Sequence, residues 1–337
     1  MNVIEDFTNI IESGICIMAG TAKERKYTQE QLQKKVNRMR GLMSVVMTVS
    51  DKVLRKPKNI VGKELFIETR EYMETPGDTD ARSGPDDGGG KVRVLAYNME
   101  NTEKLPLFVN IHGSGFTIGD AGMDDPFMMN IASNANVKII SIDYSLAPEA
   151  PFPTALGECY AVVRYAKDHP DEFGIDPDRI AVGGQSAGGN FTAGICLMDN
   201  EKKALGLKCV ILDYPPMDIY TDASEKPHPR GSIPNFMSRM FDACYCIDKE
   251  QRKNPLVSPV YATPGQLRSF PPTLVITASR DSLCEEGEVF KDKLHNAGVE
   301  VTHKRFNAVH GFNLKPGEDA DESWRLIIAH LNRYLWS

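Results

Sequence analysis

The sequence predicts an α/β protein with a mostly parallel central sheet and helices between its strands. Short apolar runs recur from Leu105 to the C-terminus, with stretches of helical spacing between them. Such runs suit strands buried on both faces of a parallel sheet. The chain has 337 residues, 41% of them hydrophobic and 25% charged, which is an ordinary globular composition. The expected strands cover residues 105–111, 137–143, 179–184, 208–214, 271–279 and 299–306.

The region before this alternation has a different pattern. The first 55 or so residues are expected to be helical, starting with an amphipathic helix and ending at Pro57. The second part of this region repeats apolar residues at helical spacing, at Leu32, Val36, Met39, Met43, Val46 and Val53. Residues 63–70 and 91–97 then alternate as strands do, and the Gly/Asp-rich stretch 76–90 between them is expected to be a surface loop.

The alternation lapses once more, between about residues 215 and 255. This stretch is too long for a simple connection, so we expect an inserted helical segment. With residues 1–55 it would form a cap over the strand ends of a single domain, 1–337. The catalytic core would then comprise about 60–214 and 256–337, and a helix from about Asp321 to Trp336 would pack on the sheet.

Charge and cysteine content exclude several classes of partner. The net charge is −7, and no Lys/Arg run is present that would follow a phosphate backbone, so no nucleic acid is expected. No stretch approaches the roughly 20 apolar residues that span a bilayer, and the acidic N-terminus is not an export signal. We expect a cytoplasmic protein without a membrane partner. The seven cysteines lack zinc-like spacing. No metal or cofactor is expected, and a homodimer is left open.

The strongest chemical motif is Gly184-Gln185-Ser186-Ala187-Gly188, which follows an apolar strand and precedes a helical run. A Gly-x-Ser-x-Gly sequence in this context favours a strained turn that exposes the serine, with glycines where strand and helix approach closely. The helix N-terminus would offer the N–H of Ala187 to an oxyanion. A glycine-rich packing turn is the alternative.

A serine nucleophile needs a base, and the carboxylate and histidine should follow it in the chain on loops after strands. Asp281 follows the strand 271–279, and His310 follows the strand 299–306. The order Ser, Asp, His is that of the α/β-hydrolases. Rival carboxylates are Glu285 and Glu286, which we expect to be solvated charges at a helix start. The other six histidines lie in helices, strands or loops that suit structural roles.

The segment His112-Gly113-Ser114-Gly115 follows the strand 105–111, where a loop would supply further oxyanion donors. Fixed backbone N–H groups are effective there because they need no reorganisation during the reaction.

Five segments, in order, resemble the hormone-sensitive-lipase-like family of bacterial esterases: HGSGF, DYSLAPEAPFP, GQSAGG, DSLCEEG and VHGF. The resemblance runs from about Leu105 to the C-terminus, and the N-terminal cap is assigned by position only. It implies an α/β-hydrolase fold with a triad and oxyanion donors, and a structural role for His112 in shaping the loop. The triad would be Ser186, Asp281 and His310, and the oxyanion donors would be the N–H groups of Ser114, Gly115 and Ala187.

Three positions depart from the family pattern. Ser114 stands where the family usually has glycine, Gln185 where it has aspartate, and Ser145 where it has arginine. A side chain at Ser114 would disfavour a glycine-like backbone or narrow the pocket. The loss of an arginine and an aspartate suggests that a local charged contact is missing.

The expected function is that of a carboxylesterase that acts on small, short-acyl esters through an acyl-enzyme intermediate. Deacetylation of carbohydrates and amide hydrolysis at the same site stay open. Two alternatives come from other classes. A nucleotide-binding fold is imitated by the glycines after Ile111, but their spacing is not G-x-G-x-x-G. A ligand-binding protein on a hydrolase scaffold would not need His310.

Overall fold

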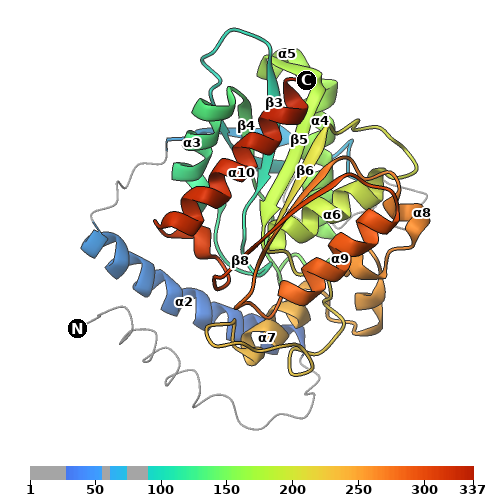
Figure 1. Cartoon of the computed structure of the whole chain (residues 1–337). Helices are drawn as coiled ribbons and strands as arrows, with labels where there is room; N and C mark the ends of the chain where they lie inside the picture. The colour runs from blue at the N-terminus through green and yellow to red at the C-terminus, as the bar shows by residue number, and fades with distance from the viewer. Residues whose placement is uncertain (1–27, 55–60, 74–89) are drawn as a thin grey trace.

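The centre of the molecule is an eight-stranded sheet (Figure 1). The computed structural model describes residues 28–54, 61–73 and 90–337, with side chains described outside 42–54. The strand order is β1-β2-β4-β3-β5-β6-β7-β8. The strands are β1 Lys63–Glu68, β2 Lys91–Tyr97, β3 Leu105–Ile111, β4 Lys138–Asp143, β5 Ile175–Gln185, β6 Cys209–Asp213, β7 Thr273–Ala278 and β8 Val301–Phe306.

The predicted mostly parallel sheet is confirmed. β2 runs antiparallel to both β1 and β4, and all other neighbouring strands are parallel. Every residue of β3 and of β6 is buried, because helices cover both faces of the sheet. This burial explains why these segments read as continuous apolar runs rather than as alternating ones.

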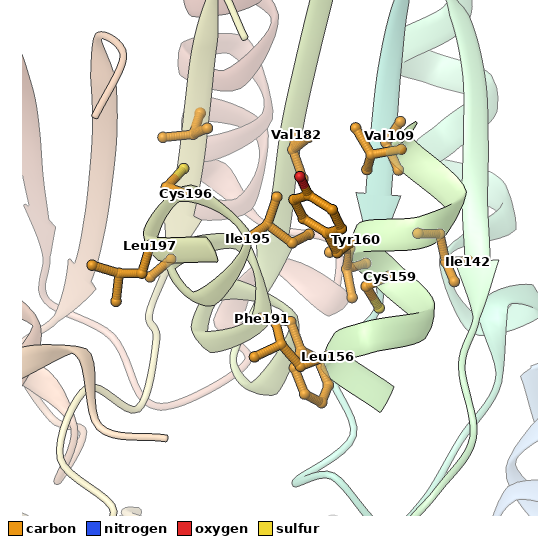
Figure 2. Packing of buried hydrophobic residues seen from close by; sticks show 14 of the residues in the cluster. Val109, Ile142, Leu156, Cys159, Tyr160, Val182, Phe191, Ile195, Cys196 and Leu197 are labelled. Carbon is orange, nitrogen blue, oxygen red and sulfur yellow. The ribbon is translucent and has the colours of Figure 1, made fainter. Parts of the chain in front are cut away.

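Helices pack on both faces of the sheet. One face is covered by α4, α6 and α9, whose side chains join one large core cluster with alternate strand residues (Figure 2). The other is covered by α3 and α10. The helices are α2 Gln29–Leu54, α3 Asp125–Ala135, α4 Thr154–Asp168, α5 Pro170–Phe173, α6 Ala187–Asp199, α7 Asn235–Tyr245, α8 Pro264–Leu267, α9 Cys284–Asn296 and α10 Glu318–Leu335. Short 3-10 turns cover Ala121–Asp124, Glu250–Lys253, Pro259–Tyr261 and Phe312–Leu314.

The two segments predicted to form a cap differ in their helix content. Residues 29–54 form the expected helix, whereas the amphipathic helix expected at the N-terminus, Pro57 and most of the loop 76–90 lie outside the described residues. The segment 215–255 was expected to be an inserted helical segment. It contains α7 and one 3-10 turn, and the rest is irregular, which fits the prolines at 227, 229 and 234.

The topology brings the predicted site residues to one edge of the sheet. Ser186 follows β5, and the segment 112–115 follows β3, while Asp281 and His310 follow β7 and β8. The carboxyl ends of parallel strands meet at the same edge, which is where ligands bind in open α/β sheets. In Figure 1 the arrowheads of these strands point toward α2 and α7. Among the described helices, none is long and apolar enough to cross a membrane.

Candidate active site

Ser186 lies on a strained turn between β5 and α6. Its backbone has φ 51° and ψ −121°, a conformation that costs a non-glycine residue free energy and persists only when the surroundings impose it. The Ser186 N–H donates to the carbonyl of Asp213 at 2.8 Å. A Cβ atom on Gly184 or on Gly188 would overlap the carbonyl oxygen of Ile111. The two glycines of the motif are therefore required by the close approach of β3.

Three side chains from distant parts of the chain form one hydrogen-bonded row. His310 Nε2 lies 2.9 Å from Ser186 Oγ, and His310 Nδ1 lies 2.6 Å from Asp281 Oδ2. The other carboxylate oxygen of Asp281 accepts the N–H of Leu283 at 3.1 Å. Because a carboxylate only accepts, Nδ1 carries the proton and Nε2 is left as an acceptor for the serine hydroxyl.

The surroundings of His310 strengthen it as a base. Burial alone would lower the pKa of His310, but the charge of Asp281 and its hydrogen bond outweigh this effect and raise the pKa. The Asp281 side chain is fully buried, whereas 16% of the His310 side chain is exposed. The ring of Tyr214 packs edge-on against the imidazole at 5.0 Å between centroids. The imidazole is thus held from two sides and still faces the serine.

The loop after β3 lies directly against the serine. A Cβ on Gly113 would lie 3.4 Å from Ser186 Cβ, so the two segments are in contact. Gly115 has φ +52°, and a side chain there would meet the ring of Phe241 at 2.8 Å. Ala187 is the first residue of α6. Among the described residues, no acceptor receives the N–H groups of Gly115 or Ala187.

The departure at Ser114 has a structural explanation. The φ of Ser114 is not in the left-handed region, so the residue does not need the backbone conformation that favours glycine. Its Oγ accepts the N–H of Phe116 at 2.8 Å and lies 2.5 Å from the hydroxyl of Tyr144, which also contacts the carbonyl of His112 at 2.8 Å. The carbonyl of His112 can only accept, so the single Tyr144 hydrogen goes to it, and the Ser114 hydroxyl donates to the Tyr144 oxygen. The loop is therefore braced by a side chain that glycine lacks.

The other two departures are of different kinds. Ser145 donates through its hydroxyl and its N–H to Glu158, both at 2.7 Å. The Glu158 carboxylate is thus hydrogen-bonded by neutral donors, where the family pattern has an arginine. Gln185 is buried under the turn, and its Oε1 has no hydrogen-bond partner among the described residues.

Glu286 and His112 lie near the site, and both are buried. Glu286 was expected to be solvated, but it is buried. Its carboxylate accepts the N–H groups of Met217 and Asp218 and pairs with Lys226 at 2.6 Å. It therefore anchors the segment after β6. His112 is fully buried and stacks on Tyr144 at 4.3 Å, and burial lowers the pKa of its imidazole. That arrangement suits a role in shaping the loop.

Sequence reasoning missed a buried network beneath the site. Asn313 donates to Asp213 Oδ2 at 2.7 Å and accepts the Tyr214 hydroxyl at 2.7 Å, and its carbonyl accepts from Trp324. Asp213 also holds the backbone of Ser186, so the network joins the serine turn to the loop that follows His310. The sequence offered one signal for this network: an aspartate and a tyrosine, Asp213 and Tyr214, end the predicted strand that comes next after the serine motif.

Comparison with known proteins agrees with this geometry. The family model described as the α/β hydrolase fold matches residues 108–314. The chain belongs to the α/β-hydrolase family. It is 31% identical to an arylesterase of Saccharolobus solfataricus over 252 residues, 69% of this chain and 80% of that protein. A mimivirus protein named as an α/β hydrolase is 32% identical over 219 residues, 64% of this chain, and the match spans 63% of that relative's length.

The structure is also similar to that of an esterase from the archaeon Pyrobaculum calidifontis. The TM-score is 0.74 at 26% identity, and the match covers 90% of this chain and 96% of the other. The predictions of an α/β-hydrolase fold, of the hormone-sensitive-lipase-like family and of an enzyme of the carboxylesterase class are confirmed at the level of the family.

Proposed function

We propose that this α/β-hydrolase cleaves small carboxylic esters through an acyl-enzyme intermediate, with Ser186 as nucleophile, His310 as general base and Asp281 as its orienting carboxylate. One observation carries the proposal. Two hydrogen bonds, at 2.9 and 2.6 Å, join these three side chains in a row beside N–H groups that no described residue accepts. A hydrogen-bonded serine, histidine and carboxylate beside such donors is the arrangement that acyl transfer requires.

The first half of the reaction transfers the acyl group to the enzyme. Ser186 Oγ attacks the ester carbonyl carbon while its proton passes to His310 Nε2. The negative charge that develops on the carbonyl oxygen is stabilised by the N–H groups of Ser114, Gly115 and Ala187. The intermediate collapses, the bond to the alcohol oxygen breaks, and the imidazolium returns its proton to that oxygen.

The second half restores the enzyme. A water molecule gives a proton to His310 Nε2 and attacks the acyl carbon, and the same N–H groups stabilise the second oxyanion. When the bond to Ser186 Oγ breaks, the imidazolium protonates the serine and the acid leaves. The raised pKa of His310 suits both proton transfers, because the imidazole must accept and release one proton in each half.

Small esters are the substrates that we expect. The ring of Phe241 on α7 packs against Gly115 and limits the space beside the oxyanion loop. We assign α2 and the segment 215–255 to a cap over the strand ends, since both α2 and α7 lie at that edge of the sheet. The arylesterase relative also supports an ester substrate.

Hydrolysis of p-nitrophenyl esters from acetate to dodecanoate tests the proposal. We expect kcat/KM to be highest for the short acyl groups. The Ser186→Ala variant should fold normally and lose activity by a factor on the order of 10⁵ to 10⁶. Labelling of the wild type, but not of the variant, with a fluorophosphonate would identify Ser186 as the nucleophile. Near-full activity in Ser186→Ala would overturn the assignment of the nucleophile. Failure of the wild type to react with the probe would favour a ligand-binding role instead.

A further inference from the structure

Helix α2 contacts the part of the molecule that carries the oxyanion loop. Leu32 and Val36 are fully buried and form a small apolar cluster with Ala147 and Cys244. Ala147 lies in the loop after β4, and Cys244 lies in α7, so the first half of α2 packs between them. Figure 1 shows α2 and α7 side by side beyond the strand ends. This packing brings the polar side chains of α2 within reach of the site.

Arg40 makes the most extensive of these polar contacts. Its Nε donates to the carbonyl of Thr117 at 2.8 Å, and its Nη2 donates to the carbonyl of Ala147 at 3.0 Å. The same guanidinium pairs with both oxygens of Glu149, at 2.5 and 3.0 Å. The planar fork of arginine can hold two carbonyls and a carboxylate at once, whereas the single ammonium of lysine cannot.

The two carbonyls that Arg40 binds belong to two segments that contact each other: Thr117 ends the tight turn that bears the proposed oxyanion donors, and Ala147 lies in the loop after β4. The N–H of Thr117 donates to the carbonyl of Ser114 at 3.1 Å, and the carbonyl of Phe116 accepts the N–H of Ala147 at 2.8 Å. Arg40 therefore contacts both of these segments, the turn through Thr117 and the loop after β4 through Ala147.

The turn also needs external support. Gly115 and the adjacent Phe116 have φ values of +52° and +65°. A positive φ costs Gly115 little, but it strains a bulky residue such as Phe116 and persists there only where neighbouring contacts impose it. Phe116 is held by stacking on Tyr245 at 4.0 Å, and the far end of the turn is held by Arg40.

We propose that Arg40 of α2 is a positioning residue for the oxyanion hole, which fixes the turn 114–117 through the carbonyls of Thr117 and Ala147 so that its N–H groups face the tetrahedral oxyanion. The inference rests on the proposed esterase function. It makes α2 part of the catalytic geometry and not only a cover. A misplaced donor weakens binding of the transition state more than binding of the substrate.

A structural role alone would give a different result from a positioning role. If Arg40 only attached α2, its loss would lower the melting temperature and leave the rate of folded protein unchanged. The Glu149 side chain with which Arg40 pairs is 48% exposed, so solvent screens this ion pair.

The experiment compares Arg40→Ala and Arg40→Lys with Arg38→Ala, a matched control that removes an exposed arginine from the same helix. We expect kcat for p-nitrophenyl acetate to fall about 10- to 100-fold in both Arg40 variants, less than the 100- to 1,000-fold loss when a donor is removed. KM should change by less than about twofold, as a loss restricted to the transition state requires. Affinity for a trifluoromethyl ketone, which forms the tetrahedral adduct, should fall by the same factor as kcat/KM.

Chemical rescue separates positioning from general destabilisation. Millimolar guanidinium ion should restore part of the kcat of Arg40→Ala and should have no effect on Arg38→Ala. Unchanged kcat in folded Arg40→Ala, or an equal loss of kcat in Arg38→Ala, would overturn the inference. If Arg40→Ala does not fold, Arg40→Lys decides in the same way. Failure of the wild type to hydrolyse esters would instead refute the proposed function, because no Arg40 variant is needed to observe it.

Discussion

The proposed triad and the proposed oxyanion loop meet at one site but are held by different parts of the molecule. Ser186, Asp281 and His310 each follow a strand of the sheet, and the buried network of Asp213 and Asn313 supports them from beneath. The loop 112–115 also follows a strand and contacts Tyr144 at the end of β4, but its turn is in addition contacted by Arg40 of α2, which lies outside the sheet. The positions of Ser186, Asp281 and His310 follow from the order of the strands that they end. The contact between Arg40 and Thr117 depends instead on how a helix outside the sheet packs on the loop.

The difference predicts two kinds of defect. A change in the triad should alter proton transfer and therefore the pH profile, because His310 is the group that titrates. A change in the support of the loop should lower the rate at every pH, because backbone N–H groups do not titrate. A change in the support of the loop that shifts the pH profile, or a change in the triad that leaves it unshifted, would contradict this division.

Among changes to the groups that support Ser186, the largest effect is expected from Asp281→Asn. An amide can donate to His310 Nδ1, which stabilises the wrong tautomer and removes the acceptor that the serine needs, so kcat should fall by a factor on the order of 10³ to 10⁴. Loss of the Asp281 charge also removes the contribution that raises the pKa of His310. The residual activity should therefore persist to lower pH than in the wild type.

The measurement is the pH dependence of kcat/KM for p-nitrophenyl acetate. Glu285→Gln is a matched control, since it makes the same change at an exposed carboxylate four residues away. An acidic limb that stays in place in Asp281→Asn would show that Asp281 does not set the basicity of His310.

A smaller effect is expected from Tyr144→Phe. The change removes the hydroxyl that contacts the carbonyl of His112 and Ser114 Oγ but keeps the ring that stacks on His112. We expect kcat to fall by about tenfold, less than the loss for removal of a whole donor. The pH profile should keep its shape.

Steady-state kinetics across the pH range check this expectation, with Tyr165→Phe on α4 as the control. A shifted acidic limb in Tyr144→Phe would contradict the division between triad and loop, because it would connect the brace to the titration of His310.

The sequence was sufficient to predict the sheet and the residues of the row. Strand ends, a Gly-x-Ser-x-Gly turn and the order of the three residues can all be recognised locally, since each depends on a few neighbouring residues. The brace could not be predicted in this way. Arg40 is separated from Thr117 by 77 residues and from Ala147 by 107, and an arginine on a helix is usually a solvated charge. The irregular parts of the segment 215–255 could not be predicted as such, because apolar residues such as Met217 and Ile219 pack on the core without helical hydrogen bonds.

The smallest effect on rate is expected from Asp213→Asn, which tests the support beneath the triad. Burial raises the pKa of Asp213 to about 7, so the folded protein binds a proton that the unfolded chain releases near pH 4. This contribution to stability is fully present below about pH 4 and is lost as the pH rises through about 7. Asp213 Oδ1 and Gln185 Oε1 are both buried without a partner among the described residues and border one small cavity.

An amide at position 213 removes the titration and supplies a donor beside the cavity that Gln185 also lines. The free energy of unfolding of Asp213→Asn should therefore fall less steeply between pH 4 and 7, by up to about 1 kcal/mol per pH unit for one bound proton. Because the backbone carbonyl that holds Ser186 is unchanged, kcat should stay within a few-fold of the wild type. Urea unfolding at several pH values measures the slope, with the exposed Asp178→Asn as control. An unchanged slope would mean that Asp213 is ionised in the folded protein, and that Asn313 alone satisfies it.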